Sequence, residues 1–184
     1  MKKKCLIGLV GKACSGKDTV AHYLVEKHGF LHVSTGDFIR SYVLEHALGE
    51  PTRDVLRQVG NKLRAQYGPD YFVRLAMQQA TPFTVVSGIR AVAEAEALLE
   101  QGTILLVEAP IMLRYNRTVQ RGRESDHISF ETFVAQEKAE DNNPDPAAQN
   151  IMACMKLATH KLSNTGDLDI LKGQIDMAMR VLLG

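Results

Sequence analysis

A glycine-rich turn near the start of the chain is the sequence feature that most restricts the fold. Residues 11–17 read Gly-Lys-Ala-Cys-Ser-Gly-Lys and fit the pattern G-x-x-x-x-G-K. The apolar run Cys5–Val10 precedes this turn, and apolar residues at helical spacing follow it over 18–28. In this strand–loop–helix order the backbone N–H groups can wrap a phosphate, and the positive end of the helix faces the anion. The sequence therefore predicts a phosphate-binding loop.

The residues that we expect to contact ATP in this loop are Gly11, Lys12, Ala13, Cys14, Ser15, Gly16, Lys17, Asp18 and Thr19. Glycines allow the backbone conformations that wrapping a phosphate requires, and the lysine that ends the motif reaches the β- and γ-phosphates. A ligand for Mg²⁺ is expected directly after this lysine. Asp18 stands there instead of Ser or Thr, and Thr19 is next. Both are candidate Mg²⁺ ligands, and the sequence does not choose between them.

Short apolar runs alternate with helical patterns along the rest of the chain. We expect strands over 4–10, 30–33, 83–86, 104–107 and 159–162. We expect helices over 18–28, 34–47, 52–63, 71–80, 91–100, 112–122, 130–141, 147–157 and 168–182. Such alternation is typical of a parallel sheet covered by helices on both faces. The sequence therefore predicts a three-layer α/β/α domain around a five-stranded parallel sheet.

Composition narrows the class of partner. The 22 Lys and Arg residues nearly balance the 21 Asp and Glu residues, which leaves a net charge of +1. This balance gives no general reason to expect nucleic acid or a membrane surface as a partner. The three cysteines are widely spaced, and no apolar stretch approaches the roughly 20 residues that span a bilayer. We therefore expect a cytoplasmic protein whose partners are small molecules, with the oligomeric state left open.

Three further stretches carry a resemblance to a known family. Together they resemble P-loop nucleoside monophosphate kinases: SGKDTVA in the loop, STGDFIR over 34–40 and SGIRAVAEAEALLEQG over 87–102. Residues 34–40 are also similar to a segment of adenylate kinases. The stretch 52–60, with 68–72 after it, looks closer to deoxynucleoside monophosphate kinases, as does Gly88-Ile89-Arg90 followed by Glu94. The segment 163–166 also occurs in the wider group, which includes dephospho-CoA kinases. The resemblance covers nearly the whole chain.

The resemblance implies roles for residues on the acceptor side of the site. Arg40, Arg90 and Arg64 would hold the acceptor phosphate, a task that suits guanidinium groups. Glu94, one helical turn after Arg90, would read the acceptor base or else be an exposed helix residue. Asp37 would orient the acceptor or the metal, or else cap the helix after the second strand. In many relatives an aspartate stands where this chain has Ser87, so no Walker-B-like acidic ligand is expected there.

A basic segment follows the fourth expected strand. Arg114, Arg117 and Arg121 share one helix face, and Arg123 lies just beyond. In the family, such lid arginines close over the transferring phosphoryl group, neutralise its charge and exclude water. We expect Arg117 and Arg121 to act on that group, with Lys17 and Arg90, and Arg114 to bind substrate. Asn164 and Thr165, before the last helix, would contact the donor adenine or else form a turn.

The resulting expectation is a single kinase domain that uses ATP with Mg²⁺. Its core would comprise 1–34, 81–113 and 147–184, with a helical region for the nucleoside monophosphate over 35–80 and a lid region over about 114–141. The expected reaction moves the γ-phosphoryl group of ATP to a (deoxy)nucleoside monophosphate. Two alternatives stay open at this point: transfer to a ribose hydroxyl, as in dephospho-CoA kinases, with Asp37 as base, and a nucleotide-binding relative without catalysis. The choice between ATP and GTP is open too.

Overall fold

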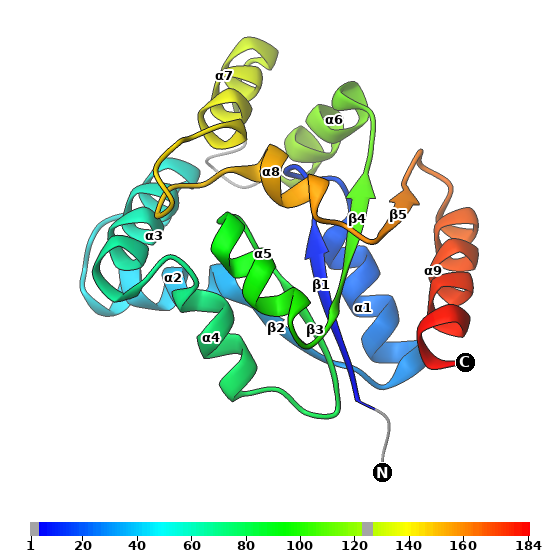
Figure 1. The fold of residues 1–184 in the computed structure, drawn as a ribbon. Helices are drawn as coiled ribbons and strands as arrows, with labels where there is room; N and C mark the ends of the chain where they lie inside the picture. Colours follow the sequence, from blue (N-terminus) through cyan, green and yellow to red (C-terminus); the bar gives the residue numbers. More distant parts are fainter. Residues whose placement is uncertain (1–3, 123–126) are drawn as a thin grey trace.

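Five parallel strands form the centre of the protein in a computed structural model, which describes residues 4–122 and 127–184. The strands are β1 (Cys5–Val10), β2 (Leu31–Ser34), β3 (Phe83–Ser87), β4 (Thr103–Glu108) and β5 (His160–Ser163). Their order across the sheet is β2-β3-β1-β4-β5, so the first strand of the chain is the middle one (Figure 1). This arrangement confirms the expected α/β fold with a five-stranded parallel sheet. The strand order is typical of P-loop kinases.

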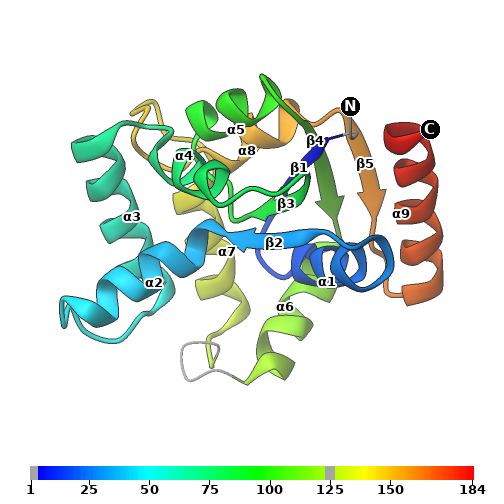
Figure 2. The ribbon, with the colours of Figure 1, turned by 90° about the horizontal axis from the view of Figure 1, so that it is seen from below.

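The strands are apolar because both faces of the sheet are covered. In the middle strand, Ile7 and Leu9 are buried on the face that carries α1 (Lys17–His28) and α9 (Leu168–Leu183). On the other face, Val86 and Ile104 pack with α4 (Tyr71–Gln78), α5 (Val92–Leu99) and α8 (Ile151–Lys156). Figure 2, seen from below, shows α1 and α9 on one side of the strands and α5 and α8 on the other.

Helices inserted between β2 and β3 form a small core of their own. These helices are α2 (Thr35–Glu45), α3 (Arg53–Tyr67) and α4. The buried residues that they share are Ile39, Leu63 and Phe72. The α3 helix begins where the sequence predicts, because the Thr52 side chain accepts a hydrogen bond from the backbone N–H of Val55. The α2 helix begins directly at the carboxyl end of β2, whereas α4 also packs on one face of the sheet.

Two helices follow β4 and lie over the carboxyl ends of the strands. They are α6 (Ile111–Arg121) and α7 (Phe130–Asp141), and both agree with the sequence prediction to within a residue. The next helix differs: we expected it over 147–157, but α8 begins at Ile151, where the Asn150 side chain caps it by accepting from Ala153 N. The side chain of Asp70, which directly precedes α4, pairs with Arg74 Nε at 3.1 Å.

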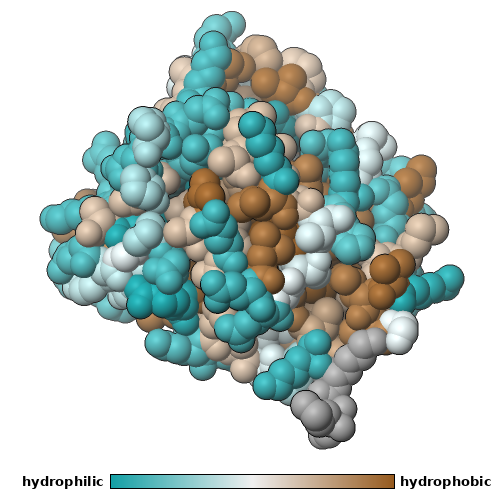
Figure 3. Space-filling view, viewed as in Figure 1, coloured by the Kyte–Doolittle hydropathy of each residue, from teal (hydrophilic) through white to brown (hydrophobic). Residues whose placement is uncertain are grey.

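The described surface mixes polar and apolar side chains. The face seen in Figure 3 carries a hydrophobic strip near its centre, bordered by hydrophilic side chains. Within residues 4–122 and 127–184, no helix is long and apolar enough to cross a membrane.

Candidate functional site

The phosphate loop, residues 11–16, joins β1 to α1 as the motif predicts. Two of its glycines cannot be replaced without a clash, since a Cβ at Gly11 would lie 2.2 Å from the Val107 carbonyl oxygen, and one at Gly16 would lie 2.1 Å from Asn164 Nδ2. Both also have positive φ angles, 143° and 105°. Cys14 has a φ of 54°, and its Sγ accepts a hydrogen bond from Thr118 on α6 at 3.1 Å. The loop is therefore held by contacts with β4, with Asn164 after β5 and with α6.

Lys17 is folded back across this loop. Its Nζ donates to the carbonyl oxygens of Gly11 at 2.8 Å and Lys12 at 2.7 Å. Burial, helped by the positive charge of Arg90, lowers the pKa of Lys17 to about 8. A phosphate group at the loop would favour the charged lysine again, because an opposite charge nearby stabilises the ammonium form.

This lowered pKa gives a pH-dependence for nucleotide binding. ATP should bind the protonated form of Lys17, so we expect its affinity to be constant below the pKa of about 8 and to fall as the pH rises above it. Binding near pH 8 should also take up protons. Isothermal titration calorimetry in buffers of different ionisation enthalpy would measure both effects.

The matched control is Lys17→Arg. A guanidinium stays protonated over this range, so the affinity of this variant for ATP should not change between pH 7 and 9, however weak it is. A wild-type affinity that also stays constant across this range would contradict the assignment of Lys17 as the titrating phosphate ligand.

A cavity of about 470 Å³ lies beside the loop, at the carboxyl ends of β2 and β3. It brings together several residues that the sequence predicts for the site: Ala13, Cys14, Lys17, Asp18, Asp37, Arg40, Arg90 and Arg121. Asp37 lies in the first turn of α2, whose N-cap residue is Ser34. His32 also lines this cavity and is 2.8 Å from the Ser87 hydroxyl, with a pKa that burial lowers.

A smaller cavity of about 190 Å³ is also lined by Lys17. The sequence-predicted residues that line it are Cys14, Gly16, Lys17, Asp18, Thr19, Arg117 and Arg121. Arg117 reaches the loop directly, with Nη1 3.4 Å from the Cys14 carbonyl oxygen. The two cavities share four lining residues, Cys14, Lys17, Asp18 and Arg121, so they belong to one site.

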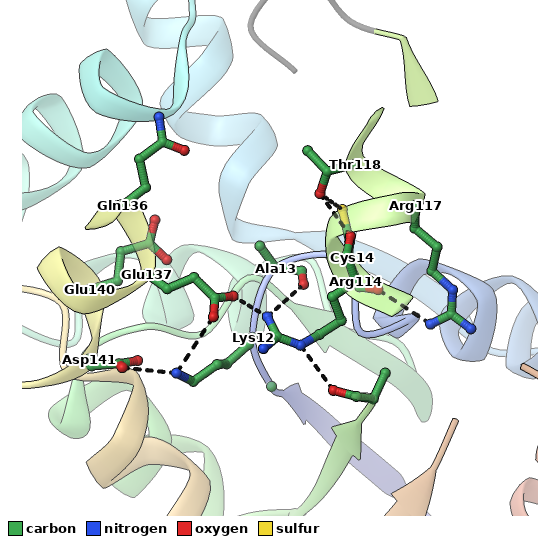
Figure 4. Close-up of polar contacts among 12 residues, drawn as sticks. Lys12, Ala13, Cys14, Arg114, Arg117, Thr118, Gln136, Glu137, Glu140 and Asp141 are labelled. Atoms are coloured by element: carbon green, nitrogen blue, oxygen red, sulfur yellow. Dashed lines mark hydrogen bonds and ion pairs between the residues drawn. The ribbon is translucent and has the colours of Figure 1, made fainter. Parts of the chain in front are cut away.

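Carboxylates of α7 face the cations of the site, and sequence reasoning missed them (Figure 4). Lys12 Nζ lies 2.8 Å from Asp141 Oδ2 and 3.7 Å from Glu137 Oε2. Glu137 also pairs with Arg114, which is nearly fully buried. Glu140, one turn further along α7, joins Arg53 and Arg90. The α7 helix therefore neutralises cations on both the loop and the acceptor side.

Arg64 and Glu94 correct two expectations. Both side chains are completely buried, and they form an ion pair with Arg64 Nε 2.8 Å from Glu94 Oε1. The other oxygen of Glu94 accepts from the backbone N–H groups of Arg90, at 3.0 Å, and Ala91, at 3.1 Å. Arg64 therefore does not face the acceptor, and Glu94 does not read its base. The pair instead supports the backbone that presents Arg90.

Asn164 and Arg114 also lie elsewhere than expected. Asn164 is buried, donates to the Ser15 carbonyl oxygen at 2.9 Å and accepts from Arg117 Nη2 at 2.9 Å. Asn164 therefore braces the loop, with the nitrogen and the oxygen of its amide engaged by Ser15 and Arg117. Arg114 donates to the Ala109 carbonyl oxygen at 3.0 Å and pairs with Glu137, contacts that join α6 to the end of β4 and to α7. Thr165 lines a separate cavity of about 340 Å³ with Lys12 and Ser15.

The site includes two residues to which the sequence analysis gave no role. Arg53 and Gln136 line the larger cavity, from α3 and α7. Arg123, expected in the basic segment, lies outside the described residues. Among the residues that the structure does describe, no group of three or more His, Cys, Asp and Glu side chains is placed to hold a metal ion.

Fold and site together define a P-loop domain of the kinase type, built to bind a nucleotide. The family profile described as "AAA domain" (AAA_18) matches residues 7–143. The chain belongs to this P-loop family and to the UPF0200 proteins. A UPF0200 protein of Pyrobaculum aerophilum is 31% identical over 140 residues, which are 73% of this chain and 76% of that protein. One of Methanosarcina barkeri is 34% identical over 134 residues, 68% and 71% of the two chains.

Solved structures resemble this fold over almost its full length. The crystal structure of TT1252 from Thermus thermophilus has a TM-score of 0.64 and 23% identity, and the match covers 100% of both chains. A shikimate kinase from Acinetobacter baumannii, solved in complex with shikimate, has a TM-score of 0.58 and 16% identity, covering 98% of this chain and 94% of that one. These likenesses extend to the kinase-like fold, and they leave the acceptor open.

Proposed function

We propose that this protein is an ATP-dependent phosphotransferase that moves the γ-phosphoryl group of ATP to the phosphate of a (deoxy)nucleoside monophosphate. One observation carries this proposal: Lys17 of the phosphate loop lies in the same cavity as Arg40 and Arg90, which come from α2 and the end of β3. A cavity with a phosphate loop on one wall and guanidinium groups on another suits two phosphate groups that must meet. The likeness of the sequence to nucleoside monophosphate kinases over 34–40 and 87–102 supports this acceptor class.

Positioning and charge would supply the catalysis. The phosphate of a monophosphate acceptor has its second pKa near about 6, so it is largely dianionic at neutral pH and needs no general base. Lys17 would hold the β- and γ-phosphates, and Arg90 with Arg40 would hold the acceptor phosphate in line with them. Arg117 and Arg121, which line the smaller cavity, would neutralise charge on the transferring group.

Asp18 and Thr19 fit the Mg²⁺ that such a reaction uses. Both are exposed beside Lys17 in the smaller cavity, and carboxylate and hydroxyl oxygens are the ligands that Mg²⁺ prefers. Bound there with ATP, Mg²⁺ would offset the negative charge of the phosphates. The protein would supply one or two ligands, and the phosphates and water would supply the others.

A hydroxyl acceptor is the second candidate, and Asp37 favours it. This carboxylate lines the acceptor cavity together with Lys17, so it could take the proton of an attacking hydroxyl group. Transfer to the ribose hydroxyl of dephospho-CoA would use this chemistry, and the fold neighbours named shikimate kinase are kinases named for an acceptor other than a nucleotide.

A panel of acceptors tests the proposal. ADP release from Mg-ATP should rise above the background ATPase rate with at least one ribo- or deoxyribonucleoside monophosphate, and less with dephospho-CoA or shikimate. Arg90→Ala should chiefly raise the KM for the acceptor. Turnover of dephospho-CoA alone, lost in Asp37→Asn, would favour the second candidate instead. If ATP binds but none of these acceptors is phosphorylated, the proposed reaction is wrong.

A further inference from the structure

Arg53 is the first residue of α3, and contacts with α7 hold it beside the larger cavity, which we assign to the acceptor. Its Nε donates to Glu140 Oε1 at 2.5 Å, and its Nη1 donates to Gln136 Oε1 at 3.3 Å. Its guanidinium carbon lies 5.9 Å from the centre of the Phe133 ring. These contacts come from three residues of α7, so the guanidinium is fixed in place, and the side chain lines the cavity that also contains Arg90.

One carboxylate holds two guanidinium groups at this point. Glu140 accepts from Arg53 with one oxygen and from Arg90 Nη1, at 2.8 Å, with the other. Burial alone would raise the pKa of Glu140, but the positive charges of Arg90 and Arg53 outweigh it and hold the pKa at about 2. Glu140 therefore stays ionised at neutral pH and keeps the two arginines together as a pair.

The third nitrogen of the Arg53 guanidinium has no partner. Nη2 is buried and makes no hydrogen bond with any residue that the structure describes. A buried N–H donor without an acceptor is costly, and it is rare unless a ligand or water occupies the position in the working protein. Because the Arg53 side chain lines the larger cavity, a ligand bound in that cavity could accept the hydrogen bond of Nη2.

The charges around Arg53 indicate the chemistry of that ligand. Lys17, Arg40, Arg90 and Arg121 line the same cavity, against the carboxylates of Asp18 and Asp37. Glu140 cancels only one of the two charges that it joins. The wall of the cavity nearest to the pair is therefore cationic and presents planar groups of N–H donors, which suit an anion that accepts several hydrogen bonds at once.

We propose that Arg53 is a ligand for the anionic group of the acceptor, acting together with Arg90, and that Glu140 is the positioning residue that presents the two arginines side by side. The anion is a phosphate monoester if the proposed function holds, and the inference rests on that function for the identity of the acceptor. Each arginine uses part of its guanidinium to bind Glu140 and turns the remainder toward the ligand.

The direct test measures anion binding while an ATP analogue occupies the phosphate loop. Magnesium and a non-hydrolysable ATP analogue would occupy the phosphate loop, and inorganic phosphate would then be titrated as the probe and followed by calorimetry. The wild-type protein should bind it at one saturable site. Arg53→Met should weaken this binding at least about tenfold, because charged hydrogen bonds are lost, while Arg53→Lys should lose less.

Arg57→Met is the matched control. Arg57 lies one turn along α3 and pairs with Asp54 at 3.0 Å, where the two side chains are 27% and 55% exposed. It should bind phosphate as the wild type does, and the affinity of all variants for the ATP analogue should be unchanged, which would also show that they are folded.

Two outcomes separate this inference from the proposed function. If Arg53→Met and Arg53→Lys both bind phosphate with wild-type affinity, Arg53 only fastens α3 to α7, and the inference is overturned even if nucleoside monophosphates are phosphorylated. If none of the acceptors in the panel is phosphorylated but phosphate binding still depends on Arg53, the anion site stands and the proposed reaction fails.

Discussion

Replacing Lys17 with methionine is expected to lower the rate of phosphoryl transfer by about 10²- to 10³-fold, the usual cost of removing one group that stabilises transition-state charge. The ammonium group lies within 2.8 Å of two carbonyl oxygens of the phosphate loop, at the point where both cavities meet. Steady-state kinetics of ADP release with the best acceptor would measure the loss, and calorimetry would measure the accompanying loss of ATP affinity.

Lys27→Met provides the matched control for this prediction. Lys27 is on the same helix, but its side chain is 57% exposed and lies 3.9 Å from Asp176, far along α1 from the loop. Activity of this variant should stay near that of the wild type. If Lys17→Met kept more than a tenth of the wild-type activity, the loop would not be the site of transfer.

The second large effect is on stability. Arg64→Met should lower the free energy of unfolding by about 3–5 kcal/mol, because it leaves the charge of Glu94 buried without a counter-ion. Both side chains are fully buried, so water cannot replace the lost partner. Urea unfolding followed by circular dichroism would measure this change, and the double variant Arg64→Met with Glu94→Gln should recover part of it.

An exposed pair on the same helix calibrates the measurement. Arg57→Met breaks the ion pair with Asp54, whose carboxylate is 55% exposed, and should cost less than about 1 kcal/mol. Equal losses of stability for the Arg64 and Arg57 variants would mean that the Arg64–Glu94 pair contributes no more than a surface pair does.

The phosphate loop and the sheet were predictable because their signals are local. The spacing of Gly11, Gly16 and Lys17 is fixed by the backbone that must surround a phosphate, and it lies within seven residues of the chain. Alternation of apolar strands and amphipathic helices likewise predicts a parallel sheet without knowledge of any contact. These features are present in the structure, and the largest shifts are four residues, at the end of α3 and the start of α8.

The partners of charged residues could not be predicted in this way, because their contacts join distant parts of the chain. Arg64 and Glu94 are 30 residues apart, and Arg53 and Glu140 are 87 apart. A signal for the burial of Arg64 does exist: it follows Gly60 by one turn, on the stripe that continues through Leu56. By contrast, nothing in the local pattern around Glu140 distinguishes it from an exposed helix glutamate.

The position of β1 in the middle of the sheet has a consequence for protein synthesis. The loop directly follows β1 in the chain, but β1 pairs with β3 and β4, and Asn164, which braces the loop, comes much later in the chain. A nascent chain therefore cannot complete its nucleotide site until most of the protein has left the ribosome. Until β3 (Phe83–Ser87) has been made, the apolar Cys5–Val10 segment has no strand to pair with, and it is during this interval that we expect chaperones to matter most.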